Sequence, residues 1–138
     1  MHRAATNEDL ETIAGIAESA FGKHNPLPHD LIAQQLSAGR VSYLIDEAED
    51  AFISFSQVLD EIEIYDLAVV EDRQGQGIGQ VLFNTFLQEY ADSHLFLEVA
   101  EGNLAARHIY EKMGFQQYHE RPNYYQDGQT AILMEKKP

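Results

Sequence analysis

A stretch with three alternating glycines has the residue types that a binding site for a charged ligand needs. Gly75, Gly77 and Gly79 follow the apolar run 67–70 and lead directly into a segment with helical spacing. Glycines let the backbone approach a ligand closely and take positive φ, and the free N–H groups of a helix N-terminus attract an anion. The spacing therefore predicts a loop that binds a pyrophosphate.

Ordinary nucleotide-binding patterns do not describe this loop. A dinucleotide fingerprint requires a third glycine where Gln80 stands, and a P-loop requires Gly-Lys-Ser or Gly-Lys-Thr, which the sequence lacks. A sharp turn without a ligand is the structural alternative for the glycines.

Two carboxylates on expected strands are candidates for a general base. Glu98 lies in the strand run 95–99 and could accept a proton through a water molecule. Strict alternation places Asp66 on the same face as Ile62 and Ile64, which is an unusual position for a carboxylate unless a bulge or an active site lies there. A solvated or ion-paired strand residue is the alternative for Glu98.

The segments that position these residues follow from hydrophobic periodicity and turn signals. Thr6 and Asp9 form a variant of the capping box before the first helix, and Gly114 is placed to end the last one. The pair Asp127-Gly128 is a hairpin turn signal. Helices are expected at 7–21, 29–36, 77–91 and 103–113, and strands at 1–5, 41–45, 51–58, 62–70, 95–99, 115–125 and 130–135.

The element order is therefore β-α-α-β-β-β-α-β-α-β-β, which is typical of the α/β (α+β) class. The three strands between 41 and 70 are separated by turn-forming or acidic stretches and predict an antiparallel meander. Because no linker, repeat or low-complexity tract interrupts the chain, we expect a single domain over residues 1–138.

Composition narrows the function classes. The chain has 138 residues, no cysteine and a formal net charge of -14, so disulfides and a thiol nucleophile are excluded and nucleic acid is a poor partner.

No apolar run approaches the length of a membrane span, and we expect a cytoplasmic protein that does not bind membranes. The histidines show no metal-binding pattern, and no metal is expected. The acidic surface could concentrate a cationic amine or a basic protein N-terminus, or it could only maintain solubility.

The glycine loop resembles the signature of the Gcn5-related N-acetyltransferase (GNAT) family. The family pattern Gln/Arg-x-x-Gly-x-Gly/Ala is matched by Gln74-Gly75-Gln76-Gly77-Ile78-Gly79, and a second family region is matched by residues 97–115. The resemblance implies a GNAT fold with a mixed, mostly antiparallel sheet of about seven strands flanked by about four helices. We expect a monomer or a homodimer.

The resemblance implies acetyl-CoA as the co-substrate and a role for individual residues. Asn103 would contact the cofactor near its reacting end, and Tyr110 would be the general acid that protonates the leaving CoA thiolate. A core aromatic is the alternative for Tyr110. The Val69 N–H would donate to the developing oxyanion. The pantetheine arm would pair with Leu67, Ala68 and Val69, and the pyrophosphate would bind Gln74, Gly75, Gln76, Gly77, Ile78, Gly79 and Gln80.

Within the family, the sequence resembles the ribosomal-protein alanine N-acetyltransferase branch, on the basis of residues 97–99 and the tail 121–134. That branch acetylates protein N-termini, which implies an α-amine acceptor and makes Tyr124 and Tyr125 substrate-side residues; strand-forming aromatics are the alternative for this pair. Asp66, singled out by strand alternation, is also expected on the substrate side. The loop after the first helix lacks the Pro-Trp-Ser type segment common in the branch. A small-molecule amine such as a polyamine or an aminoglycoside-like compound therefore stays open as the acceptor, as does a non-catalytic acetyl-CoA-binding module.

Overall fold

The computed structural model describes residues 2–138, apart from the side chains of His2 and His24. Contacts divide the chain into two compact units: unit 1 contains the residues up to 57 and 65–91, and unit 2 contains 58–64 and 92–138. The elements are β1 (His2–Ala4), η1 (Asn7–Asp9), α1 (Leu10–Phe21), η2 (Gly22–His24), α2 (His29–Ala38), β2 (Ser42–Asp46), β3 (Ala51–Val58), β4 (Glu61–Val69), η3 (Glu71–Arg73), α3 (Ile78–Glu89), β5 (His94–Ala100), α4 (Leu104–Lys112), β6 (Gln116–Arg121) and β7 (Ala131–Lys136).

Over the described residues, the strands form a seven-stranded sheet in the order β1-β2-β3-β4-β5-β7-β6. β1 pairs antiparallel with β2, and β2 with β3. β4 and β5 are parallel, whereas β7 pairs antiparallel with both β5 and β6. The predicted order of helices and strands and the mixed, mostly antiparallel sheet are confirmed. Most helix boundaries lie within two residues of the prediction; α2 continues to Ala38 because Gly39, with φ of 70°, supplies its left-handed end.

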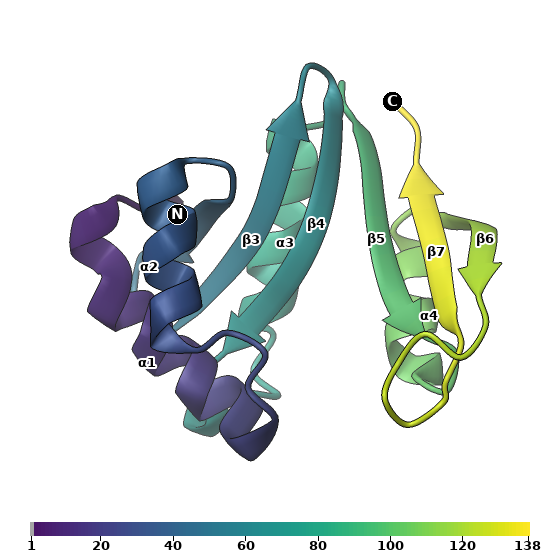
Figure 1. The fold of residues 1–138 in the computed structure, drawn as a ribbon. Helices are drawn as coiled ribbons and strands as arrows, with labels where there is room; N and C mark the ends of the chain where they lie inside the picture. Colours follow the sequence, from purple (N-terminus) through teal and green to yellow (C-terminus); the bar gives the residue numbers. More distant parts are fainter. Residues whose placement is uncertain (1) are drawn as a thin grey trace. The chain divides into compact units, whose positions relative to one another are not determined.

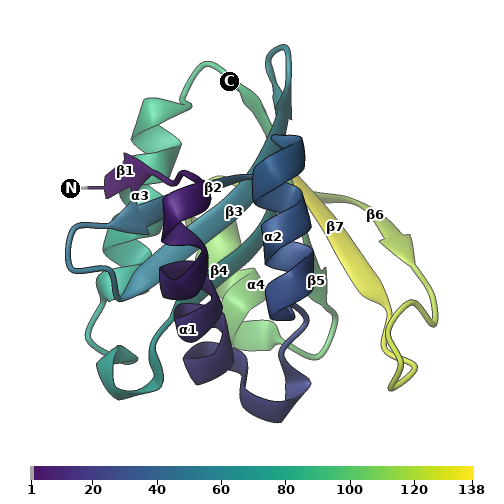
Figure 2. The same ribbon diagram turned by 60° about the vertical axis from the view of Figure 1, so that its left-hand side comes forward.

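In unit 1, helices lie on both faces of β2, β3 and the end of β4. Figures 1 and 2 show α1 and α2 on one face and α3 on the other. Successive residues of a strand point to opposite faces, so a strand that is covered on both sides is buried throughout, as β3 is from Ala51 to Phe55. Phe52 packs edge-on against Tyr43 of β2, and Phe55 packs against Phe86 of α3. The two aromatic pairs mark the two sides of the unit 1 core.

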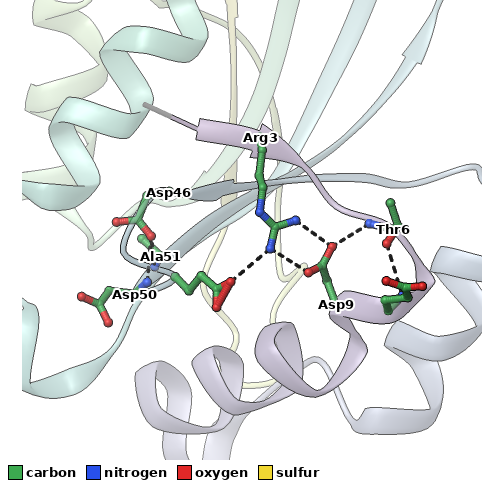
Figure 3. A network of polar contacts seen from close by, with 8 residues as sticks. Arg3, Thr6, Asp9, Asp46, Asp50 and Ala51 are labelled. Atoms are coloured by element: carbon green, nitrogen blue, oxygen red, sulfur yellow. Dashed lines mark hydrogen bonds and ion pairs between the residues drawn. The ribbon is translucent and has the colours of Figure 1, made fainter.

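An ion-paired capping box fixes the start of η1, the 3-10 helix that precedes α1 (Figure 3). The Asp9 carboxylate accepts hydrogen bonds from the Arg3 guanidinium at 2.9 and 2.7 Å and from the Thr6 N–H at 2.8 Å. The Arg3 and Thr6 donors lower the pKa of Asp9 from its ordinary value of 3.8 to about 2. The predicted capping box is confirmed. Residues 7–9 form the 3-10 helix η1, however, and the α-helix begins only at Leu10.

In unit 2, α4 lies behind β5 and β7, and no other helix of the described part of unit 2 covers the opposite face (Figure 1). Leu95, Leu97 and Val99 alternate along β5 and are buried. Phe96 and Glu98 lie between them and therefore point to the opposite face. This face of the unit 2 sheet carries the polar side chains.

The end of β6 differs from the prediction. A strand to residue 125 was expected, but β6 ends at Arg121. Asn123 has a φ of 54°, and this left-handed value cannot continue an extended strand. Residues 122–130 therefore form an irregular loop between β6 and β7.

Backbone hydrogen bonds hold this loop in place. The N–H groups of Tyr124 and Tyr125 both donate to the Gln129 carbonyl, at 3.1 and 3.2 Å. The Gln129 N–H donates to Oδ1 of Asp127 at 3.0 Å. The predicted turn at Asp127-Gly128 thus lies inside a longer loop, and the two tyrosines are loop residues instead of strand residues.

Candidate active site

The glycine loop lies in unit 1, between the end of β4 and the start of α3. Gly75 and Gly77 have φ of 78° and 81°, which other residues adopt only with strain. Gly77 is the N-cap of α3, and no side chain of the described residues caps this helix. Because the first N–H groups of a helix have no intrahelical partner, they are available to an anionic ligand.

Close packing holds the loop against the end of β4. A Cβ atom on Gly79 would lie 3.2 Å from Cγ2 of Val69 and 3.7 Å from Cδ2 of Leu67. The side-chain amide of Gln74 donates to the Val69 carbonyl at 2.9 Å. A Cβ atom at residue 79 would require the Val69 side chain to shift by a few tenths of an ångström, so glycine there permits the close packing of α3 on the strand end.

The predicted cofactor residues of unit 1 lie together in the structure. Positive φ at two glycines, an N-terminus without a side-chain cap and a helix packed on the strand end fit the pyrophosphate of acetyl-CoA. The group consists of Leu67, Ala68 and Val69 at the end of β4 and of Gln74, Gly75, Gln76, Gly77, Ile78, Gly79 and Gln80 in the loop and the first turn of α3.

Asp66, one of the two candidate bases, is half-buried in unit 1 beside Ser54. The Ser54 hydroxyl accepts a hydrogen bond from the Asp66 N–H at 3.0 Å and donates to its Oδ2 at 3.4 Å. Burial raises the pKa of Asp66, and the Ser54 hydrogen bond offsets part of that shift. Burial, together with the charge of Asp66, also raises the pKa of Tyr43 to about 12. A carboxylate with a raised pKa is a stronger base than an exposed one.

Glu98, the other candidate base, lies on β5 in unit 2, and its side chain is 29% exposed. Its Oε1 is 4.0 Å from Nη1 of Arg121, at the end of β6. The Arg121 guanidinium carbon lies 5.5 Å from the centroid of the Tyr124 ring, which contacts the Tyr125 ring edge-on. Burial and the charge of Glu98 raise the pKa of Tyr125. Within unit 2, the structure brings Glu98, Tyr124 and Tyr125 together around Arg121.

α4 carries the other two predicted residues of unit 2. Asn103 is its N-cap, and its Oδ1 accepts the Ala106 N–H at 3.2 Å. This contact gives Asn103 a structural role beside the cofactor contact that the resemblance implies. Tyr110 packs edge-on against Phe115, with ring centroids 5.9 Å apart, and burial raises its pKa. The phenol therefore keeps its proton at neutral pH, as a general acid must.

Sequence reasoning missed two polar residues of these clusters. Ser54 is 1% exposed within the apolar strand β3, and a hydroxyl at a position that alternation turns toward the core is a signal that could have identified it. Arg121 stands in the tail that carries the family resemblance, but no spacing rule connects it to Glu98. Only the pairing of β5 with β7 and of β7 with β6 brings the two side chains together.

The two units supply different chemical groups. Unit 1 offers backbone N–H groups for an anion and a half-buried carboxylate, and unit 2 offers a carboxylate and a protonated phenol. An anion site, a base and an acid are the groups needed for acyl transfer from a phosphate-bearing donor to an amine.

The comparisons with known proteins agree on the family. A family profile described as an acetyltransferase (GNAT) domain matches residues 6–138. A protein of Methanocaldococcus jannaschii, named an uncharacterized N-acetyltransferase, is 31% identical over 144 residues, which cover 98% of this chain and 90% of that protein. The [ribosomal protein bS18]-alanine N-acetyltransferase of Escherichia coli K12 is 39% identical over 90 residues, and this alignment covers only 61% of either protein.

Solved structures show the same architecture. The crystal structure of the ribosomal-protein-S18-alanine N-acetyltransferase from Escherichia coli matches with a TM-score of 0.81 and 30% identity, covering 99% of this chain and 93% of that chain. A spermidine N-acetyltransferase chimera also matches with a TM-score of 0.81, at 16% identity, and shows the likeness of fold alone. The chain belongs to the GNAT family of N-acetyltransferases, which use acetyl-CoA as their co-substrate. Among the described residues, no helix has the length and apolar character to span a membrane.

Proposed function

We propose that this protein transfers the acetyl group of acetyl-CoA to the free α-amine of a protein N-terminus. The observation that carries the proposal is the likeness to the Escherichia coli ribosomal-protein-S18-alanine N-acetyltransferase, which extends over 99% of this chain at 30% identity. The geometry of the glycine loop supports the choice of donor, because it offers positive-φ glycines and a helix N-terminus to a pyrophosphate.

The acetyl-CoA site in this proposal is built mainly from backbone. The N–H groups of the loop 75–80 bind the pyrophosphate, and the backbone of Leu67, Ala68 and Val69 pairs with the pantetheine arm. Asn103 contacts the cofactor near the thioester. The close packing of Gly79 on β4 supports this assignment, because it holds α3 against the strand that the pantetheine follows.

Glu98 and Tyr110 are the acid–base pair of the proposal. The amine nitrogen attacks the thioester carbonyl carbon, so that a C–N bond forms and the C–S bond breaks. Glu98 accepts the amine proton through a water molecule, and Tyr110 donates its proton to the CoA sulfur. The Val69 N–H stabilises the charge on the carbonyl oxygen. Solvent exchange then restores both protonation states.

Asp66 is the alternative base, and its burial and raised pKa favour it. The variants Glu98→Gln and Asp66→Asn separate the two, because only loss of the true base removes the acidic limb from the pH profile of kcat. If only Asp66→Asn loses the acidic limb of the pH profile, Asp66 and not Glu98 is the general base.

An α-amine suits a weak base. Its reference pKa of about 7.7–8.0, against about 10.4 for lysine, lowers the cost of deprotonation at neutral pH by roughly 3 kcal/mol. A carboxylate that acts through water is then sufficient.

The experiment that tests the proposal measures CoA release from acetyl-CoA with a panel of amines. The panel contains peptides with a free N-terminal alanine, the same peptides with a blocked N-terminus and an internal lysine, and spermidine. Turnover confined to free α-amines supports the proposal. Turnover with spermidine alone, which the net charge of -14 would favour, assigns the enzyme to small cationic amines. Binding of acetyl-CoA without turnover of any amine indicates a non-catalytic module.

A further inference from the structure

The polar face of the unit 2 sheet carries a groove that contains Glu98 and extends beyond it along β4 and β6. The groove has a volume of about 280 Å³, and residues of β4, β5 and β6 line it: Glu61, Glu63, Phe96, Glu98 and Tyr118. Glu61 and Glu63 are exposed, and Tyr118 is 46% exposed. The groove therefore opens to solvent and reaches Glu98, the proposed base.

Strand register places these side chains on one face. In the parallel pair of β4 and β5, Glu63 is the partner of Phe96, and in the antiparallel pair of β5 and β7 the partner of Phe96 is Glu135. Partners in adjacent strands share a face. Glu61, Glu63, Glu98 and Glu135 therefore form a row of carboxylates across three strands, which we call the acidic face.

Three carboxylates of the acidic face act on the Tyr118 hydroxyl. Burial raises the pKa of Tyr118, and the charges of Glu135, Glu63 and Glu98 raise it further, against a smaller opposite effect of Arg121. His94 contacts Glu135 at 2.6 Å. Even with Arg121 at one end and His94 beside Glu135, carboxylates outnumber cations on this face.

Aromatic walls complete the groove. The Phe96 and Tyr118 rings meet edge-on with centroids 6.0 Å apart. Arginine and lysine side chains form ion pairs with carboxylates and stack on aromatic rings, so a groove with both groups suits them. From Glu98 to His94, β5 extends for roughly 13 Å at about 3.3 Å per residue, which is the length of a short extended peptide.

We propose that the acidic face is the docking site for a basic segment of the protein acceptor, which carries arginine or lysine at about the third to fifth residue after the free N-terminus. This inference rests on the proposed function and names a sequence preference for it. A basic segment is the expected occupant because its charge is opposite to that of the acidic face. The groove reaches Glu98, so a segment bound in it would lie next to the reacting amine. Polyamine binding is an outcome of the test.

The experiment uses the double variant Glu61→Gln/Glu63→Gln with two peptides. One begins with a free alanine followed by arginines and lysines, and the other replaces each basic residue with glutamine. We expect the wild type to show a KM for the basic peptide about tenfold below that for the neutral peptide. The variant raises the KM of the basic peptide about three- to tenfold with kcat unchanged, and it leaves the neutral peptide unaffected. Glu18→Gln/Glu111→Gln changes the net charge equally at exposed sites elsewhere and leaves both KM values unchanged.

A binding measurement separates this inference from the proposed function. Fluorescence anisotropy with a labelled basic peptide whose N-terminus is already acetylated reports docking without turnover. Binding that weakens in Glu61→Gln/Glu63→Gln supports the acidic face even if no peptide is acetylated, in which case the proposed function fails alone. Equal KM values for the two peptides, equal effects of both double variants, or binding of spermine but not of the peptide would overturn the inference.

Discussion

In unit 1, helices lie on both faces of the strands, whereas in unit 2 α4 lies on one face and the polar face carries glutamates and aromatic side chains. The candidate residues differ in the same way. In unit 1 they are mostly backbone groups of a glycine loop, and in unit 2 they are side chains on strands, a helix and a loop. Strands buried on both faces have room for ligand contacts only at their ends, whereas a sheet with an open face can offer a row of side chains. In the proposal, unit 1 therefore binds the donor through backbone groups, whereas unit 2 acts through side chains on the thioester end of the donor and on the acceptor.

The largest expected effect tests the side-chain chemistry of unit 2. Tyr110→Phe should lower kcat by about 10²- to 10⁴-fold because it removes the proton donor. The Kd for acetyl-CoA should stay nearly unchanged, since the backbone sites of unit 1 are intact. Steady-state kinetics and calorimetry measure the two quantities.

Tyr90→Phe is the matched control, because burial also raises the pKa of Tyr90 but this residue ends α3 outside the proposed site. Its kcat should equal that of the wild type. Equal kcat for Tyr110→Phe and Tyr90→Phe would remove Tyr110 from the mechanism.

The second prediction concerns the doubly covered core of unit 1. Phe52 is fully buried, and Phe52→Ala should lower the free energy of unfolding by about 3–5 kcal/mol because it leaves a cavity. Urea denaturation followed by circular dichroism measures the loss. Val58→Ala, at a position 71% exposed, should change stability by less than about 0.5 kcal/mol. A loss below 1 kcal/mol for Phe52→Ala would contradict this description of the core.

The third prediction tests whether unit 1 binds the donor through its backbone. Gly77 has φ of 81°, so Gly77→Ala should strain the loop by about 1–2 kcal/mol and raise the Kd for acetyl-CoA about tenfold. Calorimetric titration measures the Kd. Gly15→Ala is the control, because Gly15 lies inside α1 with open space around its position. That variant should keep its affinity and gain up to about 1 kcal/mol in stability. Unchanged affinity in Gly77→Ala would argue against the loop as the pyrophosphate site.

The smallest expected effect tests the ion-paired cap of unit 1. Asp9→Asn should lower the free energy of unfolding at pH 7 by about 1 kcal/mol. Because the pKa of Asp9 in the folded protein, about 2, lies below its ordinary value of 3.8, the stabilisation is complete above the ordinary value and is lost as the pH falls through about 2. The variant should therefore lose less stability than the wild type between pH 4 and pH 2. Asp92→Asn, at an exposed position, should follow the wild-type curve, and identical curves for all three proteins would exclude a role of the cap charge.

The order of helices and strands was predictable because each element has a local pattern. The capping box at Thr6 and Asp9 and the glycine loop before α3 were identified from spacing alone, and the structure confirms both conformations. The prediction for β6 was wrong because its continuation to residue 125 rested on strand propensity. The left-handed Asn123 and the shared acceptor Gln129, which end the strand, are not visible in a propensity pattern.

By itself, the sequence determined the α/β class, the glycine loop, the GNAT resemblance and the candidates Glu98 and Asp66, because these follow from residue types at short, fixed spacings. Tyr110 became a candidate through the GNAT resemblance. Only the tertiary structure decided which side chains meet. Strand pairing joins Arg121 to Glu98 and forms the acidic face, and burial beside Ser54 raises the pKa of Asp66. Contacts between distant residues and the desolvation of a charge depend on how strands pair and pack, and no local pattern encodes them.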